Sequence, residues 1–256
     1  MTQPTRVRRT TREAVEIRAE AADIWHALVR REETPRWLGP DATFEAKLGG
    51  LCTATNFRGE SFSGHVVELA ATRRLVARDE DGGELDFQLD VRPRGTMVRA
   101  VRPVLLEPDD ADERADAEPR DWRLALLALR VHVEFRAELS SAHASAWTKA
   151  PRVEAWRALF GPGRFVVEGT VDQIQRRDGY KLILPGGFQA TGRAATIEPG
   201  AQFVGDAATG ELLTLSVLRA KDRTLLHAAL IGSRRPTDEL ADLAVTWQRA
   251  LAACAS

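Results

Sequence analysis

The chain has 256 residues, 44% hydrophobic and 29% charged, which is long enough for one or two domains that each bury an apolar core. Its 36 basic and 37 acidic side chains give a formal net charge of -1, and the two signs interleave, apart from a short basic cluster at Arg6–Arg9. Proteins that neutralise nucleic-acid phosphates carry a basic excess or stripe. Nucleic acid is therefore excluded as the main partner, and the basic cluster is predicted to be a solvated tail.

The two cysteines, Cys52 and Cys254, lie in opposite halves of the chain and outside any CxxC or Cys/His spacing. This usage is typical of reduced cysteines that act as small apolar residues. No apolar run reaches the length of a membrane span, and no apolar segment follows the N-terminal arginines as it does in a secretory signal. We therefore expect a cytoplasmic protein with no membrane attachment.

The second half of the chain repeats the plan of the first. Three pairs of segments occur in the same order: Ile24–Val29 with Ala155–Phe160, Ser63–Val66 with Thr191–Ala194, and Trp122–Leu126 with Trp247–Leu251. Their offsets of 131, 128 and 125 residues shrink steadily, as an old duplication with loop deletions would leave them. The sequence therefore predicts two domains, residues 1–136 and residues 137–256, with the second as a divergent copy.

In the first half, the apolar pattern predicts a strand, a helix and then a series of antiparallel strands. Alternation over residues 12–19 predicts the opening strand, and Asp23 is the expected cap of the helix that follows. Pro35 should end this helix and leave Trp37 in a loop or a short second helix. Further strands, separated by glycine or proline turns, are expected at residues 44–48, 51–57, 62–69, 74–78, 85–91 and 96–106.

The middle of the chain is predicted to contain a loop and two helical stretches. Residues 108–119 are acidic, rich in alanine and bounded by prolines, so we expect a flexible loop and the first site of proteolysis. The amphipathic helix should begin at Trp122 and end near Phe135. Residues 135–150 lack glycine and proline, which favours a helical connection that holds the two domains packed on each other.

The second half is expected to have a similar order of elements. A helix is predicted at residues 151–160 and another at 237–254. Strands are expected near residues 164–175, 179–184, 188–197, 201–205, 210–219 and 223–231. Its opening strand is not obvious, and Ala144–Thr148 is the candidate.

Several first-half segments carry a family resemblance: VEIRAEAADIWHALV, RWLGP, FEAKLGG, SFSGHVVELAATRRLV, RGTMVRAV and DWRLALLALRVHVE. Together they cover about residues 13–135 and resemble the START-like, helix-grip superfamily, within it the branch named after the Hsp90 ATPase activator homologues. The second half is similar through AWRALFG, PGGFQATGRA and TWQRAL, but RWLGP has no counterpart there.

The resemblance implies an α+β fold with two tandem domains, each a curved antiparallel sheet wrapped around a long C-terminal helix, with a cavity between sheet and helix. Such cavities in the superfamily hold sterols, lipids, polyketides or plant hormones, and some members are enzymes. Because one fold serves many functions, the resemblance does not by itself give the reaction or the ligand.

The candidate ligand-binding residues are Trp37, His65, Phe87 and Arg102. Alternation along residues 96–104 places Arg102 on the covered face of the sheet, where its charge needs a partner. The guanidinium could hold a ligand carboxylate through its planar fork, or pair with an acidic residue of the protein, which is the preferred interpretation. Trp37 lies in the segment that lines the cavity mouth in related proteins.

The sequence contains no recognisable catalytic or metal-binding motif. Its five histidines are scattered without the spacing of metal ligands, and GxSxG, Walker and strand-associated GxGxxG motifs do not occur. No catalytic residue, metal or cofactor is therefore expected. The second half lacks RWLGP and places Ala228 and Leu230 on a late strand, so it is predicted to be scaffold without a pocket.

The predicted function is non-catalytic binding of a small hydrophobic or amphipathic molecule in the cavity of the first domain. An enzyme similar to a polyketide cyclase or aromatase is one alternative, for which His65 and Arg102 are the nominated groups. A ligand-free module that binds a chaperone or a regulator is the other alternative.

Overall fold

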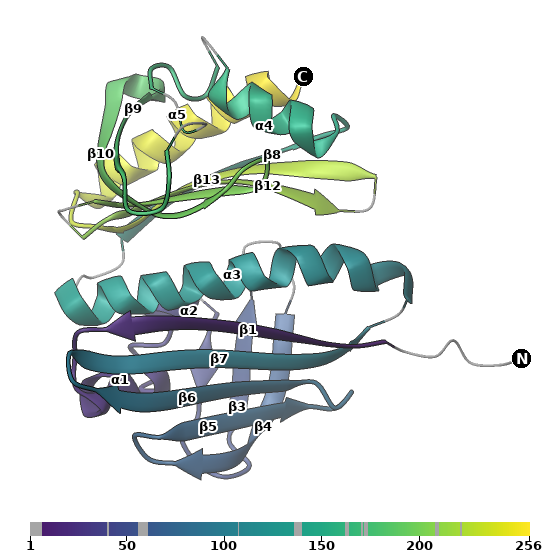
Figure 1. Ribbon diagram of the computed structural model, residues 1–256, viewed down its shortest axis with the longest axis vertical. Helices are drawn as coiled ribbons and strands as arrows, with labels where there is room; N and C mark the ends of the chain where they lie inside the picture. The colour runs from purple at the N-terminus through teal and green to yellow at the C-terminus, as the bar shows by residue number, and fades with distance from the viewer. Residues whose placement is uncertain are drawn as a thin grey trace, which may run out of the picture. The chain divides into compact units, whose positions relative to one another are not determined.

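The computed structural model describes residues 7–39, 41–55, 61–106, 108–135, 140–161, 164–169, 171, 174–207, 210–220 and 222–256, with only the backbone described at 105–106, 108–116 and 220. The chain divides into two compact units, Met1–Arg136 and Ala137–Ser256. Each unit is an antiparallel sheet with a long C-terminal helix across one face, so the predicted α+β fold is confirmed (Figure 1).

The first unit contains a seven-stranded sheet in the order β1-β7-β6-β5-β4-β3-β2. Its strands are β1 (Val7–Ile17), β2 (Thr43–Phe44), β3 (Leu51–Thr55), β4 (Ser61–Ala70), β5 (Arg74–Asp79), β6 (Glu84–Arg92) and β7 (Gly95–Leu106). Its helices are α1 (Ala21–Val29), α2 (Pro35–Leu38) and α3 (Pro108–Phe135). The strands after α2 form a meander, and the first strand pairs with the last.

The alternation of apolar residues correctly predicted which face of this sheet is covered. On β6, Leu85, Phe87 and Leu89 are buried and lie on the face that packs against α3, which we call the inner face. Phe87 is paired with Ala100 on β7, so Arg102 shares the inner face with it. The opposite face is called the outer face.

Three local predictions for the first unit are corrected by the structure. The basic cluster is not a tail from Val7 onward, because β1 begins there and pairs with β7 as far as Leu106. Asp23 is not the helix cap: Glu20 occupies that position, and Asp23 lies in the first turn, where a negative charge is favourable. The strand expected at 44–48 ends at Phe44, because the chain then turns tightly towards β3.

The turn expected between the strands at 51–57 and 62–69 lies outside the described residues, which omit 56–60. The expected positions of the four strands β4 to β7 are confirmed to within one or two residues. Trp37 lies in α2, the short second helix that the sequence left as one of two possibilities.

The loop predicted at residues 108–119 is wrong, because α3 already begins at Pro108. Proline is favourable at the first position of a helix, where no N–H is needed, and acidic residues in the opening turns interact well with the helix dipole. Pro119 lies inside α3, where it removes one backbone hydrogen bond. Pro119 is therefore accommodated inside the helix, and only Pro108 marks a helix boundary.

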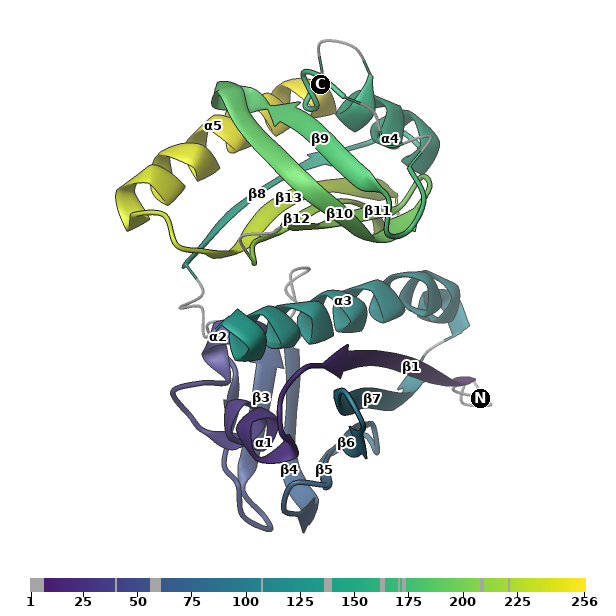
Figure 2. The same ribbon diagram turned by 60° about the vertical axis from the view of Figure 1, so that its left-hand side comes forward.

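The second unit contains a six-stranded sheet in the order β8-β13-β12-β11-β10-β9, and again the first strand pairs with the last (Figure 2). Its strands are β8 (Ser140–Thr148), β9 (Gly179–Leu184), β10 (Phe188–Glu198), β11 (Gln202–Ala207), β12 (Leu212–Ala220) and β13 (Arg223–Ser233). Its helices are α4 (Arg152–Phe160), the 3-10 turn η1 (Pro185–Gly187) and α5 (Thr237–Ala255).

The helical connection predicted for residues 135–150 is wrong. Among the described residues of this stretch, α3 ends at Phe135 and the opening strand β8 begins at Ser140. Ala142, Ala144 and Ala146 are buried in alternation on one face, and the strand pairs with β13. Pairing with a neighbouring strand therefore overrides the helix propensity of alanine.

The second unit also corrects the strand expected near residues 164–175. In the described part of that segment the structure has only an isolated bridge between Glu168 and Ile183. The core of this unit lies between its sheet and α5, where Trp247 contacts Phe165 and Phe188 edge-on, with ring centroids 5.8 and 5.7 Å apart. The fixed packing of the two domains stays a prediction.

Candidate functional site

The buried polar group that stands out in the first unit is the guanidinium of Arg102 on the inner face of β7. Its Nε donates a hydrogen bond of 2.5 Å to Oε1 of Glu118 on α3. Thr11, the residue opposite Arg102 on β1, donates a longer bond of 3.4 Å to Oε2 of the same carboxylate. The Arg102 and Glu118 side chains are 15% and 11% exposed, so the pair is largely withdrawn from water. The predicted pairing of Arg102 with an acidic residue is confirmed.

Arg102 also reaches across the curved sheet to an aromatic ring. Its Cζ lies 5.0 Å from the centre of the Phe62 ring, although Phe62 is on β4 and two strands separate β4 from β7. A cation over an aromatic face is attracted by the ring quadrupole. The guanidinium is thus held on one side by Glu118 and on another by Phe62.

One nitrogen of this guanidinium is left without a partner. Nη1 of Arg102 is buried and makes no hydrogen bond within the part of the chain that the structure describes. A buried donor without an acceptor costs about 1–3 kcal/mol. Nη1 therefore remains a buried hydrogen-bond donor that has no acceptor among the described residues.

An aromatic cluster lies on the same inner face. Phe87 is completely buried and meets Trp37, Phe44 and Trp122 edge-on, with ring centroids 5.9, 6.1 and 5.8 Å apart. Nε1 of Trp37 donates a 2.9 Å hydrogen bond to the carbonyl of Ala27, so its polar atom is already satisfied. These four rings form a buried apolar cluster on the same side of the sheet as the partly satisfied guanidinium.

The structure brings Trp37, Phe87 and Arg102 to one side of the sheet but separates His65 from them. His65 lies on the exposed outer face, because the inner positions of β4 are taken by Phe62 and Val66. Its Nδ1 lies 3.3 Å from the carbonyl oxygen of Gly49. The alternation of Phe62 and Val66 in the sequence already indicates that His65 points to the opposite face of the sheet.

The sequence did not identify Glu118, Thr11 or Phe62 as parts of the site. Glu118 was assigned to a loop, although it lies four residues before Trp122 and so shares a helix face with it. Extending the helix predicted at 122–135 by one turn towards the N-terminus would have placed Glu118 on the same helix face as Trp122. No local signal marks Phe62, because its contact with Arg102 depends on the curvature of the sheet.

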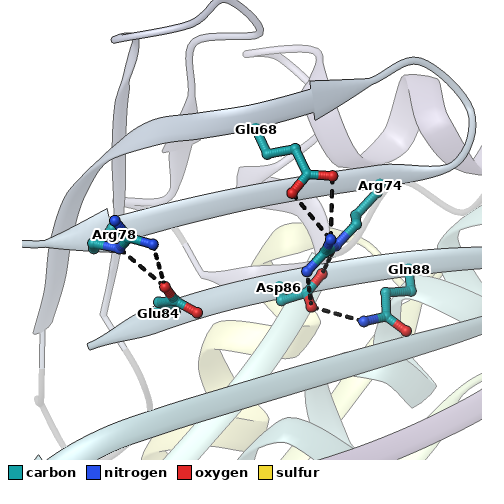
Figure 3. A network of polar contacts seen from close by, with 6 residues as sticks. All are labelled: Glu68, Arg74, Arg78, Glu84, Asp86 and Gln88. Carbon is teal, nitrogen blue, oxygen red and sulfur yellow. Dashed lines mark hydrogen bonds and ion pairs between the residues drawn. The ribbon is translucent and has the colours of Figure 1, made fainter. Parts of the chain in front are cut away.

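The outer face carries a separate network of ion pairs. Asp86 is only 6% exposed and accepts hydrogen bonds of 3.0 and 2.9 Å from Nε and Nη2 of Arg74. Gln88 donates to the same carboxylate at 2.7 Å, and Glu68 pairs with Arg74 at 3.0 Å. The hydrogen bond with Asp86 raises the pKa of Arg74 above its ordinary value. The side chains drawn in Figure 3 are Glu68, Arg74, Arg78, Glu84, Asp86 and Gln88.

This outer network satisfies its own charges. The buried carboxylate of Asp86 has three donors, and Arg78 lies 2.5 Å from Glu84 further along the face. Groups that are paired in this way stabilise the sheet locally and leave little hydrogen-bonding capacity for a ligand. The outer face is therefore a weaker candidate than the inner face.

Two further features are absent from the described residues. Within them, no group of three or more His, Cys, Asp or Glu side chains is placed to hold a metal ion. None of the described helices is both long enough and apolar enough to span a membrane.

The fold and the buried pair define the class of the first unit: a helix-grip domain, with a polar group enclosed between its sheet and its last helix. The family described as activator of Hsp90 ATPase homolog 1-like protein matches residues 18–133. The first unit of the chain belongs to this family. The origin of the second unit as a divergent copy of the first stays a prediction.

Solved structures similar to this chain each cover about half of it. The Aha1 dimer from Colwellia psychrerythraea is 21% identical, covers 49% of this chain and 96% of its own, and has a TM-score of 0.43. A Bacillus halodurans protein is 19% identical, with coverages of 51% and 99% and a TM-score of 0.44. An AHSA1-like protein from Aeromonas hydrophila is 20% identical, with coverages of 50% and 94% and a TM-score of 0.42. No curated protein matches the sequence.

Proposed function

We propose that the first unit binds a small hydrophobic or amphipathic molecule between its sheet and α3 and does not catalyse a reaction. The observation that carries this proposal is the buried Nη1 of Arg102, which has no acceptor among the described residues. Proteins rarely leave a buried donor unsatisfied, and such a group calls for a bound acceptor or an ordered water. An amphipathic ligand would supply one.

The surroundings of Arg102 support a ligand with one polar and one apolar end. The polar end would accept a hydrogen bond from Nη1, and the apolar end would contact the aromatic surface around Phe87. Ligand sites commonly combine mostly apolar walls with a few polar groups that fix orientation. The Arg102–Glu118 pair and the Phe87 cluster provide both elements on one face.

The enzyme alternative has less support from the structure. Of the two groups nominated for it, His65 lies on the outer face. The inner-face carboxylates Glu118 and Glu13 are each engaged with an arginine, Arg102 and Arg123 respectively. A general acid or base needs a free path to its substrate proton. The other alternative, a module that binds a chaperone or a regulator, is supported only by the description of the family. The test below includes the result that would favour it.

The test begins with native mass spectrometry of the full-length protein as purified. We expect an adduct of a small organic molecule, and we expect Arg102→Met to lose most of it. Arg78→Met, which removes an arginine from the outer face, should retain it. A wild-type protein that carries no adduct and binds no added fatty acid, ester or alcohol would contradict the proposal. Capture of a chaperone instead would favour the interaction alternative.

A cytoplasmic location belongs to the same proposal. Cys52 and Cys254 are both free, as expected in a reducing compartment. Fractionation of the producing cells would test it.

A further inference from the structure

The charge of Arg102 is already balanced inside the protein. Glu118 supplies one carboxylate to one guanidinium, and both side chains are largely buried. The second oxygen of Glu118 accepts from Thr11, so that carboxylate is engaged through both of its oxygens. Among the described residues, Nη1–H therefore has no hydrogen-bond acceptor, although the charge of its guanidinium is balanced by Glu118.

A second ion pair joins the same two elements, β1 and α3. Arg123 on α3 pairs with Glu13 on β1 through bonds of 2.8 and 3.1 Å, which adds no net charge to the inner face. Arg120 lies two positions beyond Glu118 along α3, and side chains two apart on a helix do not share a face.

These observations restrict the chemistry of the bound group. A carboxylate would leave a net negative charge beside the largely buried Arg102–Glu118 pair, which is costly. A cation would face a guanidinium donor. We infer that the ligand group at Nη1 is a neutral hydrogen-bond acceptor, namely a carbonyl, ester or hydroxyl oxygen. This inference rests on the proposed function. Sequence reasoning alone had named a carboxylate as the possible ligand partner of Arg102.

The inference can be tested with three probes that share one alkyl chain: octanoate, methyl octanoate and octanol. Binding to the full chain is measured by tryptophan fluorescence and by native mass spectrometry at about pH 8, where a carboxylic acid is ionised. We expect the ester and the alcohol to bind at least about ten-fold more tightly than octanoate, because a hydrogen bond to a charged donor is gained without a buried net charge.

Glu118→Gln is the decisive variant, since it removes the balancing charge and keeps the size of the side chain. Octanoate should then bind at least as tightly as the ester, because it replaces the missing carboxylate. Glu84→Gln, in the outer ion pair with Arg78, is the matched control and should leave the wild-type preference unchanged. A Glu118→Gln protein that is folded and still prefers the ester would overturn the inference.

If Glu118→Gln does not fold, a double variant replaces it. Arg102→Met with Glu118→Met removes donor and charge together, and buried ion pairs can often be replaced by apolar side chains without loss of the fold. This protein should bind octane and methyl octanoate equally, and a retained preference for the ester would count against the inference. In the wild type, tighter binding of octanoate refutes the inference but leaves ligand binding intact. Failure of every probe refutes the proposed function itself.

Discussion

Replacing Phe87 by alanine should destabilise the first unit more than almost any other single change on its inner face. The ring is fully buried and makes three edge-on contacts, with Trp37, Phe44 and Trp122. Burying a phenylalanine is worth about 1.5–3 kcal/mol, and each aromatic pair adds about 0.5–1.5 kcal/mol. Core Phe→Ala changes cost about 3–5 kcal/mol in free energy of unfolding, and we expect a value in this range.

Urea unfolding followed by NMR of the indole N–H groups would measure this cost. The chain has six tryptophans, and Trp25, Trp37 and Trp122 are the three in the first unit. With a slope of about 2 kcal/mol per molar urea, their unfolding midpoint should fall by about 2 M.

The control for this experiment is Leu48→Ala, which changes a side chain that is 69% exposed. Surface changes of this kind alter stability by about 0.5 kcal/mol or less. If Phe87→Ala shifts the midpoint no more than Leu48→Ala does, the ring does not organise this core. The aromatic surface assigned to the ligand site would then have no basis.

The remaining predictions concern single side chains. Gly205→Ala should destabilise the second unit by about 1–3 kcal/mol in thermal unfolding, because a Cβ there collides with the Tyr180 ring; an unchanged melting temperature would contradict this packing. Burial raises the pKa of Tyr180, the single tyrosine, because the fold favours the neutral phenol. This contribution to the free energy of unfolding is complete below about pH 10, the ordinary pKa of tyrosine, and decreases as the pH rises above that value. Ultraviolet titration should show no tyrosinate before unfolding. Burial also raises the pKa of Cys52 to about 12, so a thiol reagent should modify the half-buried Cys254 first, as peptide mass spectrometry would reveal. Early modification of Cys52 would refute that order.

Much of the fold followed from the sequence because it depends on local periodicity. Alternation over Leu85, Phe87 and Leu89 fixed both the strand β6 and its covered face. The same rule placed Arg102 on the inner face, and the need to pair a buried charge predicted an acidic partner. The strand and the face of each residue depend on neighbours within a few residues, and the sequence shows those neighbours directly.

Other features were decided by contacts between distant residues. The alanines of β8 favour a helix in isolation, and only pairing with β13, about 80 residues later, makes them a strand. Composition suggested a loop at 108–119, whereas that segment is helical in spite of Pro119, and Glu118 near its end contacts Thr11 of β1. Helix propensity differs by about 1 kcal/mol or less per residue for residues other than proline, and proline inside a helix costs about 3 kcal/mol, so the sum of many tertiary contacts can reverse it.

The candidate site shows the same division. The sequence nominated Trp37, Phe87, Arg102 and His65, and the structure places the first three on the inner side of the sheet and His65 on the outer face. Their role in binding stays a prediction. The sequence could not show that Glu118 balances the charge, or that Phe62 on a non-adjacent strand lies over the guanidinium. Side-chain direction along one strand has a fixed period, so the sequence determines which face a residue occupies. Which residues meet across the sheet depends on strand order and curvature, and only the tertiary structure sets these.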